Sequence, residues 1–283
     1  MGGGTRLHRR RHLDDRQGLG SLVRSRCSGT TRPLCHPRHA ESARGEGSLD
    51  TLPMSQQWTL EIAGCRCPLT APEIALDALQ QVFETFQQRA HAYRNDPRNP
   101  HLCRAGCSHC CEKGAFFAVT LAEALMLALA VEALPDAHRQ QVLRAARSLL
   151  RVQRDVFVRV EGPPDQPGCR DEDWFSKRIS QVSRTGASCP LLDQHLCSVY
   201  DSRPFLCRAY GFPTDAYAVE TDAVIVVRSL CSLYDGLDLH EVIPGKDLKR
   251  HLTDLSCRLG GGKHWGRFTS IEAITARVRR GPG

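Results

Sequence analysis

Apolar residues recur at helical spacing near the start of the regular part of the chain. Thr70-x-x-Glu73, with Pro72 in the first turn, is a capping-box pattern that marks the start of a helix. The turn signal Asn95-Asp96-Pro97 marks its end. Between these signals the apolar positions fall three and four apart, on one helical face. They are Ala75, Leu79, Val82, Phe83, Phe86 and Ala90.

A second capping box, Thr120-x-x-Glu123, opens the strongly apolar segment 121–134. Because a membrane-spanning helix needs about 20 apolar residues, this segment is too short to cross a bilayer. We therefore predict a buried core helix, which Pro135 stops.

A long amphipathic helix is predicted from Asp136 to about Val160. Its apolar residues face one side, and four arginines face largely the other. We interpret these arginines, Arg144, Arg147, Arg151 and Arg154, as a solvated surface.

Strand signals are confined to a short part of the second half. The run Gly162 to Gly168 is rich in Pro and Gly and predicts a loop, whereas the β-branched run Ala223–Val227 predicts a strand. Tyr217–Glu220 is expected to pair with it as a hairpin. The fold class is therefore mainly α with a small β element (α+β), with irregular loops converging on the cysteines described below.

The first 53 residues differ from the rest in composition. This Arg- and Gly-rich stretch has no Lys, Phe, Tyr or Trp, and it shows no sustained period, which predicts a disordered tail. The acidic pair Asp14-Asp15 is unusual for an organelle-targeting peptide. Since the composition changes at Met54, an over-extended gene start is an alternative. We expect a tail at 1–53 and a single cysteine-cluster domain at 54–283.

Net charge and hydropathy exclude some classes of function. The formal charge is +7, but the tail has ten Arg and five acids, so residues 54–283 carry only 28 − 26 = +2. A basic surface for nucleic acid is not expected in the folded part. Neither a signal-peptide core nor a membrane span stands out in the sequence, so we expect a cytoplasmic protein that does not bind membranes.

Cysteines supply the main chemical signal. Cys103-x3-Cys107-x2-Cys110-Cys111 is followed about eighty positions later by Cys189, Cys197 and Cys207, and Cys231 follows the predicted strand. Crowded thiolates repel one another unless they form disulfides or bind a soft cation. Because the cytoplasm is reducing, metal binding is the favoured interpretation.

The number of cysteines exceeds the needs of one tetrahedral ion. Adjacent residues such as Cys110 and Cys111 diverge by about 100° on a helix, so they cannot easily bind the same ion. A centre with more than one metal atom, either an iron–sulfur cluster or two zinc sites, accounts for the surplus. Both alternatives remain open at this point.

The ordered motifs resemble the YkgJ-type cysteine-cluster family, which is described as a zinc- or iron-chelating domain. The similarity runs from about residue 103 to 211. It rests on the C-x(2-3)-C-x2-C-C group, then on Cys189-Pro190-Leu191-Leu192, Cys197-Ser198-Val199-Tyr200, Arg203-Pro204 and Cys207-Arg208.

The resemblance implies metal ions as the binding partners and cysteines as their ligands. The implied ligands are Cys103, Cys107, Cys110, Cys111, Cys189, Cys197 and Cys207, with Cys231 as an eighth. The implied cofactor is an iron–sulfur cluster or zinc, in a role that includes redox chemistry. Some members carry labels such as flagellin lysine N-methylase or iron–sulfur oxidoreductase, so a metal-dependent enzyme is the alternative function. No protein partner is implied.

Residues near the cysteines are candidates for supporting roles. Arg203 and Arg208 are placed to offset thiolate charge, or else to form salt bridges with Asp201 or Asp193. His109 and His195 are alternative ligands. Tyr200 and Tyr210 are expected to pack over the site. Outside the motif stand Cys65, Cys67, Cys169 and Cys257, which we expect to be free buried thiols.

Three classes of function compete. A radical enzyme that cleaves S-adenosylmethionine would place its cysteine motif after the first strand of a β/α barrel, but here a predicted helix precedes it. A methyltransferase would need a strand before its Gly-rich turn, and none is predicted before Gly260-Gly261-Gly262. A non-catalytic metal carrier or redox-sensing module needs neither feature.

Overall fold

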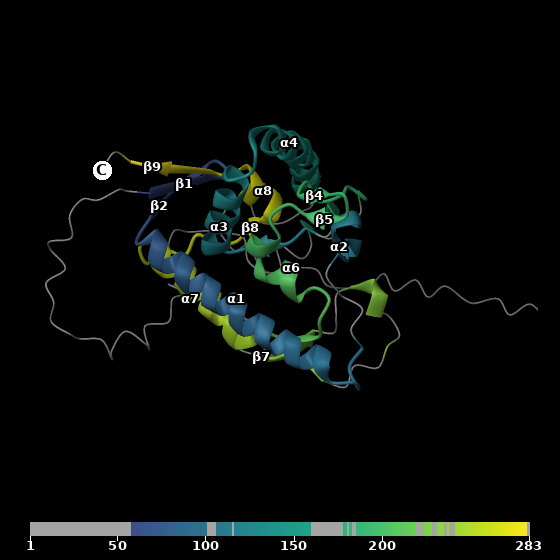
Figure 1. Ribbon diagram of the computed structural model, residues 1–283. Helices are drawn as coiled ribbons and strands as arrows, with labels where there is room; N and C mark the ends of the chain where they lie inside the picture. The colour runs from purple at the N-terminus through teal and green to yellow at the C-terminus, as the bar shows by residue number, and fades with distance from the viewer. Residues whose placement is uncertain are drawn as a thin grey trace, which may run out of the picture.

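Helix α3 (Leu121–Glu132) lies at the centre of the computed structural model (Figure 1). The structure describes residues 58–100, 106–114, 116–159, 178–179, 181–182, 185–218, 223–227, 231–234, 237 and 241–281. The predicted capping box is confirmed: the Thr120 hydroxyl accepts from the Glu123 N–H, and the Glu123 carboxylate accepts from the Thr120 N–H. Eight of the 12 residues are buried, which confirms a core helix.

Two long helices pack side by side on one flank of α3. These are α1 (Pro72–Asn95) and α7 (Lys246–Leu259) (Figure 1). The predicted apolar face of α1 is buried, and its predicted end is confirmed. The capping box at Thr70 is wrong. Ala71 takes the cap position in a left-handed conformation, and Pro72 at the first turn has no N–H that needs a cap.

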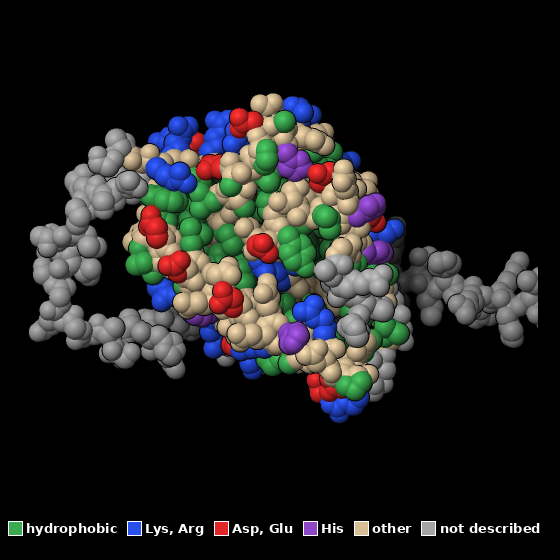
Figure 2. Space-filling model, in the orientation of Figure 1, with side chains coloured by type: hydrophobic (Ala, Val, Ile, Leu, Met, Phe, Trp, Pro, Cys, Tyr) green, Lys and Arg blue, Asp and Glu red, His purple; other side chains and the backbone are tan. Residues whose placement is uncertain are grey.

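Helix α4 (Asp136–Arg159) covers the opposite flank and packs on the short helix α8 (Ser270–Thr275). Its predicted boundaries and its exposed arginines are confirmed. In Figure 2, basic side chains gather along the upper edge of the molecule, where Figure 1 places α4 and strand β9 (Arg277–Arg280). Helix α8 begins with a capping box of its own, Thr269-x-x-Glu272.

The described strands form small antiparallel sheets, so the prediction of a mainly α fold with a small β element is confirmed. The largest sheet has the order β2-β1-β9, from Cys65–Leu69, Trp58–Ile62 and Arg277–Arg280. The other pairs are β3-β8 (Ala118–Val119, Phe268–Thr269), β4-β5 (Leu192–Asp193, Leu196–Cys197) and β6-β7 (Thr214–Ala218, Ala223–Val227). In the last pair, β7 has the predicted bounds, whereas its partner β6 begins at Thr214 rather than at the predicted Tyr217.

Several short helices carry cysteines of either group or lie close to them. They are α2 (His109–Glu112), η3 (Tyr200–Ser202), α6 (Phe205–Ala209) and η4 (Ser232–Tyr234). The predicted tail at 1–53 and the loop at 162–168 lie outside the described residues. Among the described helices, none is long and apolar enough to cross a membrane.

Candidate metal centre

The two cysteine groups lie against each other although about eighty residues separate them in the sequence. Cys110 and Cys111 belong to α2, and the backbone N–H of Cys189 donates to the carbonyl oxygen of Cys111 at 2.8 Å. Helix α6 and the β4-β5 hairpin bring Cys207 and Cys197 to the same place. A direct backbone contact therefore sets the distance between the two groups.

A glycine permits this close approach. Gly114 ends the segment that follows α2 and has φ +65°, in the left-handed region that favours glycine. A Cβ atom at this position would overlap the carbonyl oxygen of Ala187, two residues before Cys189. Only a residue without a side chain allows the two cysteine segments to meet in this way.

Exposed polar side chains also bridge the two groups. The Ser108 hydroxyl donates to Glu112 Oε1 at 2.6 Å, and His195 Nδ1 lies 2.9 Å from the same oxygen. His195 occupies the two-residue turn between β4 and β5 with Gln194, and both have positive φ, as a type I′ turn requires. These bonds hold the turn against α2.

Six cysteines line one small cavity of about 60 Å³ between these elements. They are Cys107, Cys110, Cys111, Cys189, Cys197 and Cys207. This cavity is called the sulfur pocket below. All six are free thiols that are partly exposed. Apolar side chains such as Phe117, Leu127 and Ile274 complete the lining. His195 also lines the sulfur pocket, whereas His109 does not.

The remaining two candidate ligands, Cys103 and Cys231, are not among the described residues that line the sulfur pocket. Cys103 lies outside the described residues. Cys231 is buried and lines a larger neighbouring cavity of about 660 Å³, but not the sulfur pocket. Cys107, Cys110 and Cys207 line both cavities, so the larger one opens directly beside the sulfur pocket.

Burial and mutual proximity raise the pKa values of four thiols of the sulfur pocket, those of Cys110, Cys111, Cys197 and Cys207. Burial, followed by the charges of Cys111 and Cys110, raises the pKa of Cys207 well above its usual value. Burial likewise raises the pKa of Cys197. A hydrogen bond with Cys111, together with burial, raises the pKa of Cys110. These thiols are therefore neutral at neutral pH, and a metal ion that binds them must displace protons.

Cys111 is hydrogen-bonded to two other thiols. The bond with Cys110 lowers its pKa, whereas the bond with Cys189 and burial raise it, and the result is a pKa of about 12. This chain of contacts runs from the first cysteine group into the second. It shows that the sulfur atoms of both groups face one another.

The two arginines of the motif have different surroundings. Arg203 stacks on the ring of Tyr200, with its guanidinium carbon 3.5 Å from the ring centroid, and Nε donates to the Tyr200 carbonyl. Its charge lowers the pKa values of Cys110, Cys197 and Cys207, against the larger effects that raise them. Arg203 is thus a cation that acts on several thiols, and the charge of Arg208 also lowers the pKa of Cys197.

Arg208 is buried and acts on the backbone. It donates to the carbonyl oxygens of Arg203 and Asp201, and it lies over the ring of Phe83, 4.2 Å from the centroid. Burial and the charge of Arg203 lower its pKa to about 10. Neither arginine forms a side-chain salt bridge with Asp201 or Asp193 in the described part of the chain.

Glu123 is a supporting residue that the sequence interpretation assigned only to helix capping. Its carboxylate is buried, and Oε1 accepts from the backbone N–H of Phe205 at 2.7 Å while Oε2 serves the cap of α3. Phe205 begins α6, the helix that carries Cys207. One carboxylate therefore fixes this cysteine helix to the core.

Cysteines outside the motif fall into two groups. Cys65 and Cys67 are free thiols in β2, and burial raises the pKa of Cys67 to about 12. Cys257 is buried but disulfide-bonded, so the expectation of a free thiol there is wrong. Helical periodicity does not reveal such a bond. Cys169 lies outside the described residues.

The thiols of the sulfur pocket lie close together but do not form a closed coordination sphere. Across the described ranges, no three or more Cys, His, Asp or Glu side chains already stand in an arrangement that could hold a metal ion. Thiol–thiol hydrogen bonds take the place of such an arrangement.

Comparison with known families agrees with this geometry. Residues 102–232 match the family model described as "CxxCxxCC: Putative zinc- or iron-chelating domain". The match confirms the family recognised from the cysteine motif, and it extends through Cys231. The description of this model supports zinc or iron chelation by the matched segment. No curated protein and no solved structure matches the chain.

Proposed function

We propose that the two cysteine groups bind an iron–sulfur cluster and that the protein has a redox-related role. The observation that supports the proposal is the sulfur pocket, in which six thiols from both groups line one cavity. Thiolates are the ligands that iron–sulfur clusters and zinc prefer. When bound, the cluster would supply a centre for electron transfer.

The number of thiols favours a cluster over a single zinc ion. A structural zinc ion takes four ligands, so six thiols in one pocket exceed what one ion requires. A cluster of several iron atoms uses cysteines from several directions, which suits the adjacent pair Cys110-Cys111. Cys103 and Cys231 remain further candidate ligands, on the strength of the family motif. Two closed zinc sites are the second candidate, since they would also use the surplus.

Arg203 has a defined role in this proposal. Several thiolates in one pocket accumulate negative charge, and a nearby guanidinium offsets it. The pKa effects of Arg203 on three cysteines support this role. We assign Arg208 to positioning instead, because it binds the carbonyl oxygens of the segment that leads into Cys207. A reducing compartment such as the cytoplasm would keep the thiols available.

The alternative is a metal-dependent enzyme, such as a protein lysine N-methylase or an iron–sulfur oxidoreductase. One observation favours catalysis: the cavity of about 660 Å³ shares Cys107, Cys110 and Cys207 with the sulfur pocket. A carrier or sensor has no need of such a space next to its metal. Sites of about 300–1,000 Å³ are typical for small-molecule ligands.

Elemental analysis of the full chain, purified without oxygen, tests the proposed cluster. We expect iron and acid-labile sulfide together, with visible absorption that disappears on reduction or exposure to air. Colourless protein that holds zinc and no sulfide would favour the two zinc sites. Protein without either metal after reconstitution would overturn both.

Variants identify the ligands. Cys107→Ser and Cys207→Ser are expected to lower bound metal, because each removes a thiol from the sulfur pocket. Cys65→Ser is the matched control, since Cys65 is a partly exposed free thiol in β2 that does not line this pocket. Equal metal content in all three variants would contradict the ligand assignment.

A further inference from the structure

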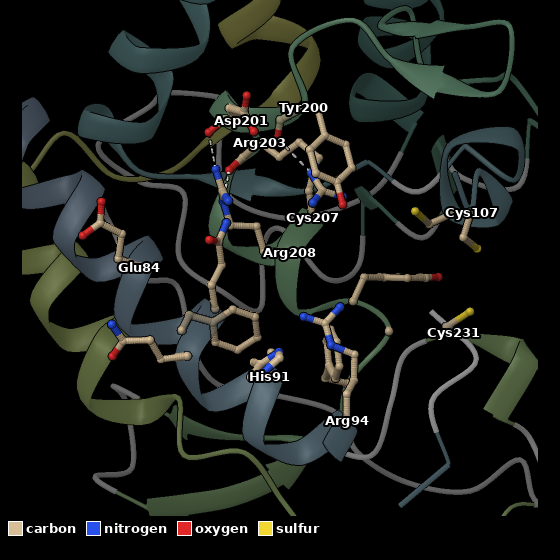
Figure 3. Close-up of a pocket in the computed structure, with 18 residues that line it drawn as sticks. Glu84, His91, Arg94, Cys107, Tyr200, Asp201, Arg203, Cys207, Arg208 and Cys231 are labelled. Atoms are coloured by element: carbon tan, nitrogen blue, oxygen red, sulfur yellow. Dashed lines mark hydrogen bonds between the residues drawn. The ribbon is translucent and has the colours of Figure 1, made fainter. Parts of the chain in front are cut away.

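The cavity of about 660 Å³ beside the sulfur pocket has the features of a ligand site of its own. Helix α1 forms one wall, and the segment from Tyr200 to Phe212 forms the other (Figure 3). The thiols of Cys107 and Cys231 lie at one end (Figure 3). A ligand in this space would therefore contact both a helix outside the family domain and the cysteine end of the site.

Two cations face this space without an anionic partner. Arg94 extends from the last turn of α1, and Arg203 lies across the cavity from it (Figure 3). Within the described part of the chain, neither forms a salt bridge. The position of Arg94 also suits the negative end of the α1 dipole, but this leaves its hydrogen-bond donors available. Each guanidinium group can donate to the oxygens of an anion in this space.

The two acidic residues of the lining lie in different places. Glu84 lies at the end opposite Cys107 and Cys231, whereas Asp201 lies beside Arg203 (Figure 3), and Glu84 Oε1 accepts from Gln80 at 3.1 Å. His91 is 2.9 Å from the Asn95 amide. The end of the cavity next to the sulfur atoms is consequently the positive one. It is the part of the cavity where an anion would bind.

Aromatic rings give the cavity an apolar wall. The buried rings of Phe86 and Phe212 pack edge to face beneath it, with centroids 6.1 Å apart, and Arg94 lies over the Phe212 ring. Tyr200 and Tyr210 also line it, and Tyr210 packs on Phe117 of the sulfur pocket at 5.3 Å. Flat ligands pack well against such rings. Charge and shape together thus select an anion with an apolar body.

We propose that this cavity binds a small organic carboxylate with a flat apolar body, whose carboxylate lies between Arg94 and Arg203. Its body contacts Tyr200 and Tyr210, the partly exposed aromatic residues of the lining. In this position the carboxylate reaches the sulfur end of the cavity. The inference rests on the proposed function in one respect. The ligand lies beside a metal centre only if the sulfur pocket holds metal.

Binding of para-fluorobenzoate, followed by fluorine NMR, tests the proposal on the full chain with its metal bound. We expect saturable binding to the wild type and none of the neutral isostere para-fluorobenzamide. Loss of one charge-assisted hydrogen bond weakens binding by about tenfold, so Arg94→Gln and Arg203→Gln should each show this effect. Arg144→Gln is the control, since Arg144 is an exposed arginine of α4 that lines neither cavity.

Metal content, measured in every variant, separates the two hypotheses. Arg94 lies on α1, away from the cysteine segments, so its variant should retain metal and lose only the carboxylate. Equal binding of benzoate and benzamide, or unchanged binding in Arg94→Gln, would overturn the carboxylate site while leaving the metal proposal intact. Should the wild type hold no metal, the same titration on metal-free protein still decides whether the carboxylate site exists.

Discussion

The helical framework and the sulfur pocket are built in different ways. Helix α3 buries eight of its 12 residues, whereas α2, which carries Cys110 and Cys111, buries none. Fully burying a large apolar side chain contributes about 1.5–3 kcal/mol, so the framework is stabilised by its own core. The cysteine segments depend on hydrogen bonds, on two left-handed residues of the β4-β5 turn and on one close backbone approach.

This contrast assigns different tasks to the two regions. The framework sets where the cysteine segments begin and end, because Glu123 in α3 binds the start of α6. The segments themselves hold protonated thiols with raised pKa values. Since metal binding replaces thiol protons, the free energy of metal binding also contributes to the stability of these segments. Changes in the two regions should therefore be distinguishable.

The largest effect on the site is expected from Gly114→Ala. The added Cβ collides with the Ala187 carbonyl, and a left-handed non-glycine residue costs about 1–2 kcal/mol in addition. We expect the variant to lose most of its bound metal and to keep its helical circular dichroism. Gly186→Ala is the matched control, because φ is also positive there but nothing lies near the new atom. If the two variants bind equal metal, close approach at Gly114 does not matter.

An intermediate effect is expected from Glu123→Gln. The amide offers a donor where the N–H of Thr120 or Phe205 needs an acceptor, and such a buried mismatch costs about 1–3 kcal/mol. Both the free energy of unfolding and the metal content should fall. Chemical denaturation and elemental analysis measure them.

Its control is the equivalent glutamate of α8. Glu272→Gln breaks the same kind of capping box, but Glu272 binds Gln153 rather than a cysteine segment. We expect a similar loss of stability with unchanged metal content. Parallel loss of metal in both variants would show that Glu123 has no special link to Cys207.

The smallest effect concerns the framework alone. Arg89 binds both oxygens of Asp247, at 2.8 and 2.7 Å, and joins α1 to α7. This bond lowers the pKa of Asp247, so its stabilisation is present above the unfolded pKa of about 4 and is lost as pH falls through the lower folded pKa. Because Asp247 is half exposed, the contribution is about 0.5 kcal/mol.

Denaturation of Asp247→Asn at two pH values tests this expectation. The variant should be less stable than the wild type at pH 7, and the difference should shrink as the pH falls below about 4. The control Asp254→Asn, at an exposed position of the same helix, should match the wild type at both. A difference that grows on acidification would have the wrong sign for this ion pair.

The framework helices were predictable because their signals are local. Periodicity and caps gave α3 and α4 nearly to the residue, and the same kind of signal, Thr269-x-x-Glu272, also marks the start of α8. The cap at Thr70 failed because Ala71 adopts a left-handed conformation that no local pattern demands. Local interactions thus account for the elements but not for every boundary.

The sheets and the disulfide were not predictable in the same way. Strand β1 pairs with β9 across more than 200 residues, Trp58 opposite Arg280, and both strands are too short for a clear period. For the site, the family motif identified the cysteines, and spacing alone does not show that Cys231 faces a different cavity. The bond from Glu123 to Phe205 depends on tertiary packing.

The pairing of β1 with β9 has a consequence for the matched family segment. That segment, 102–232, contains α3 but not α1, α7 or α8, which cover it. An excised fragment with these limits would expose the apolar surface of α3 to water. It would also lack the paired strands β1 and β9. The matched segment therefore packs against helices that the rest of the polypeptide supplies.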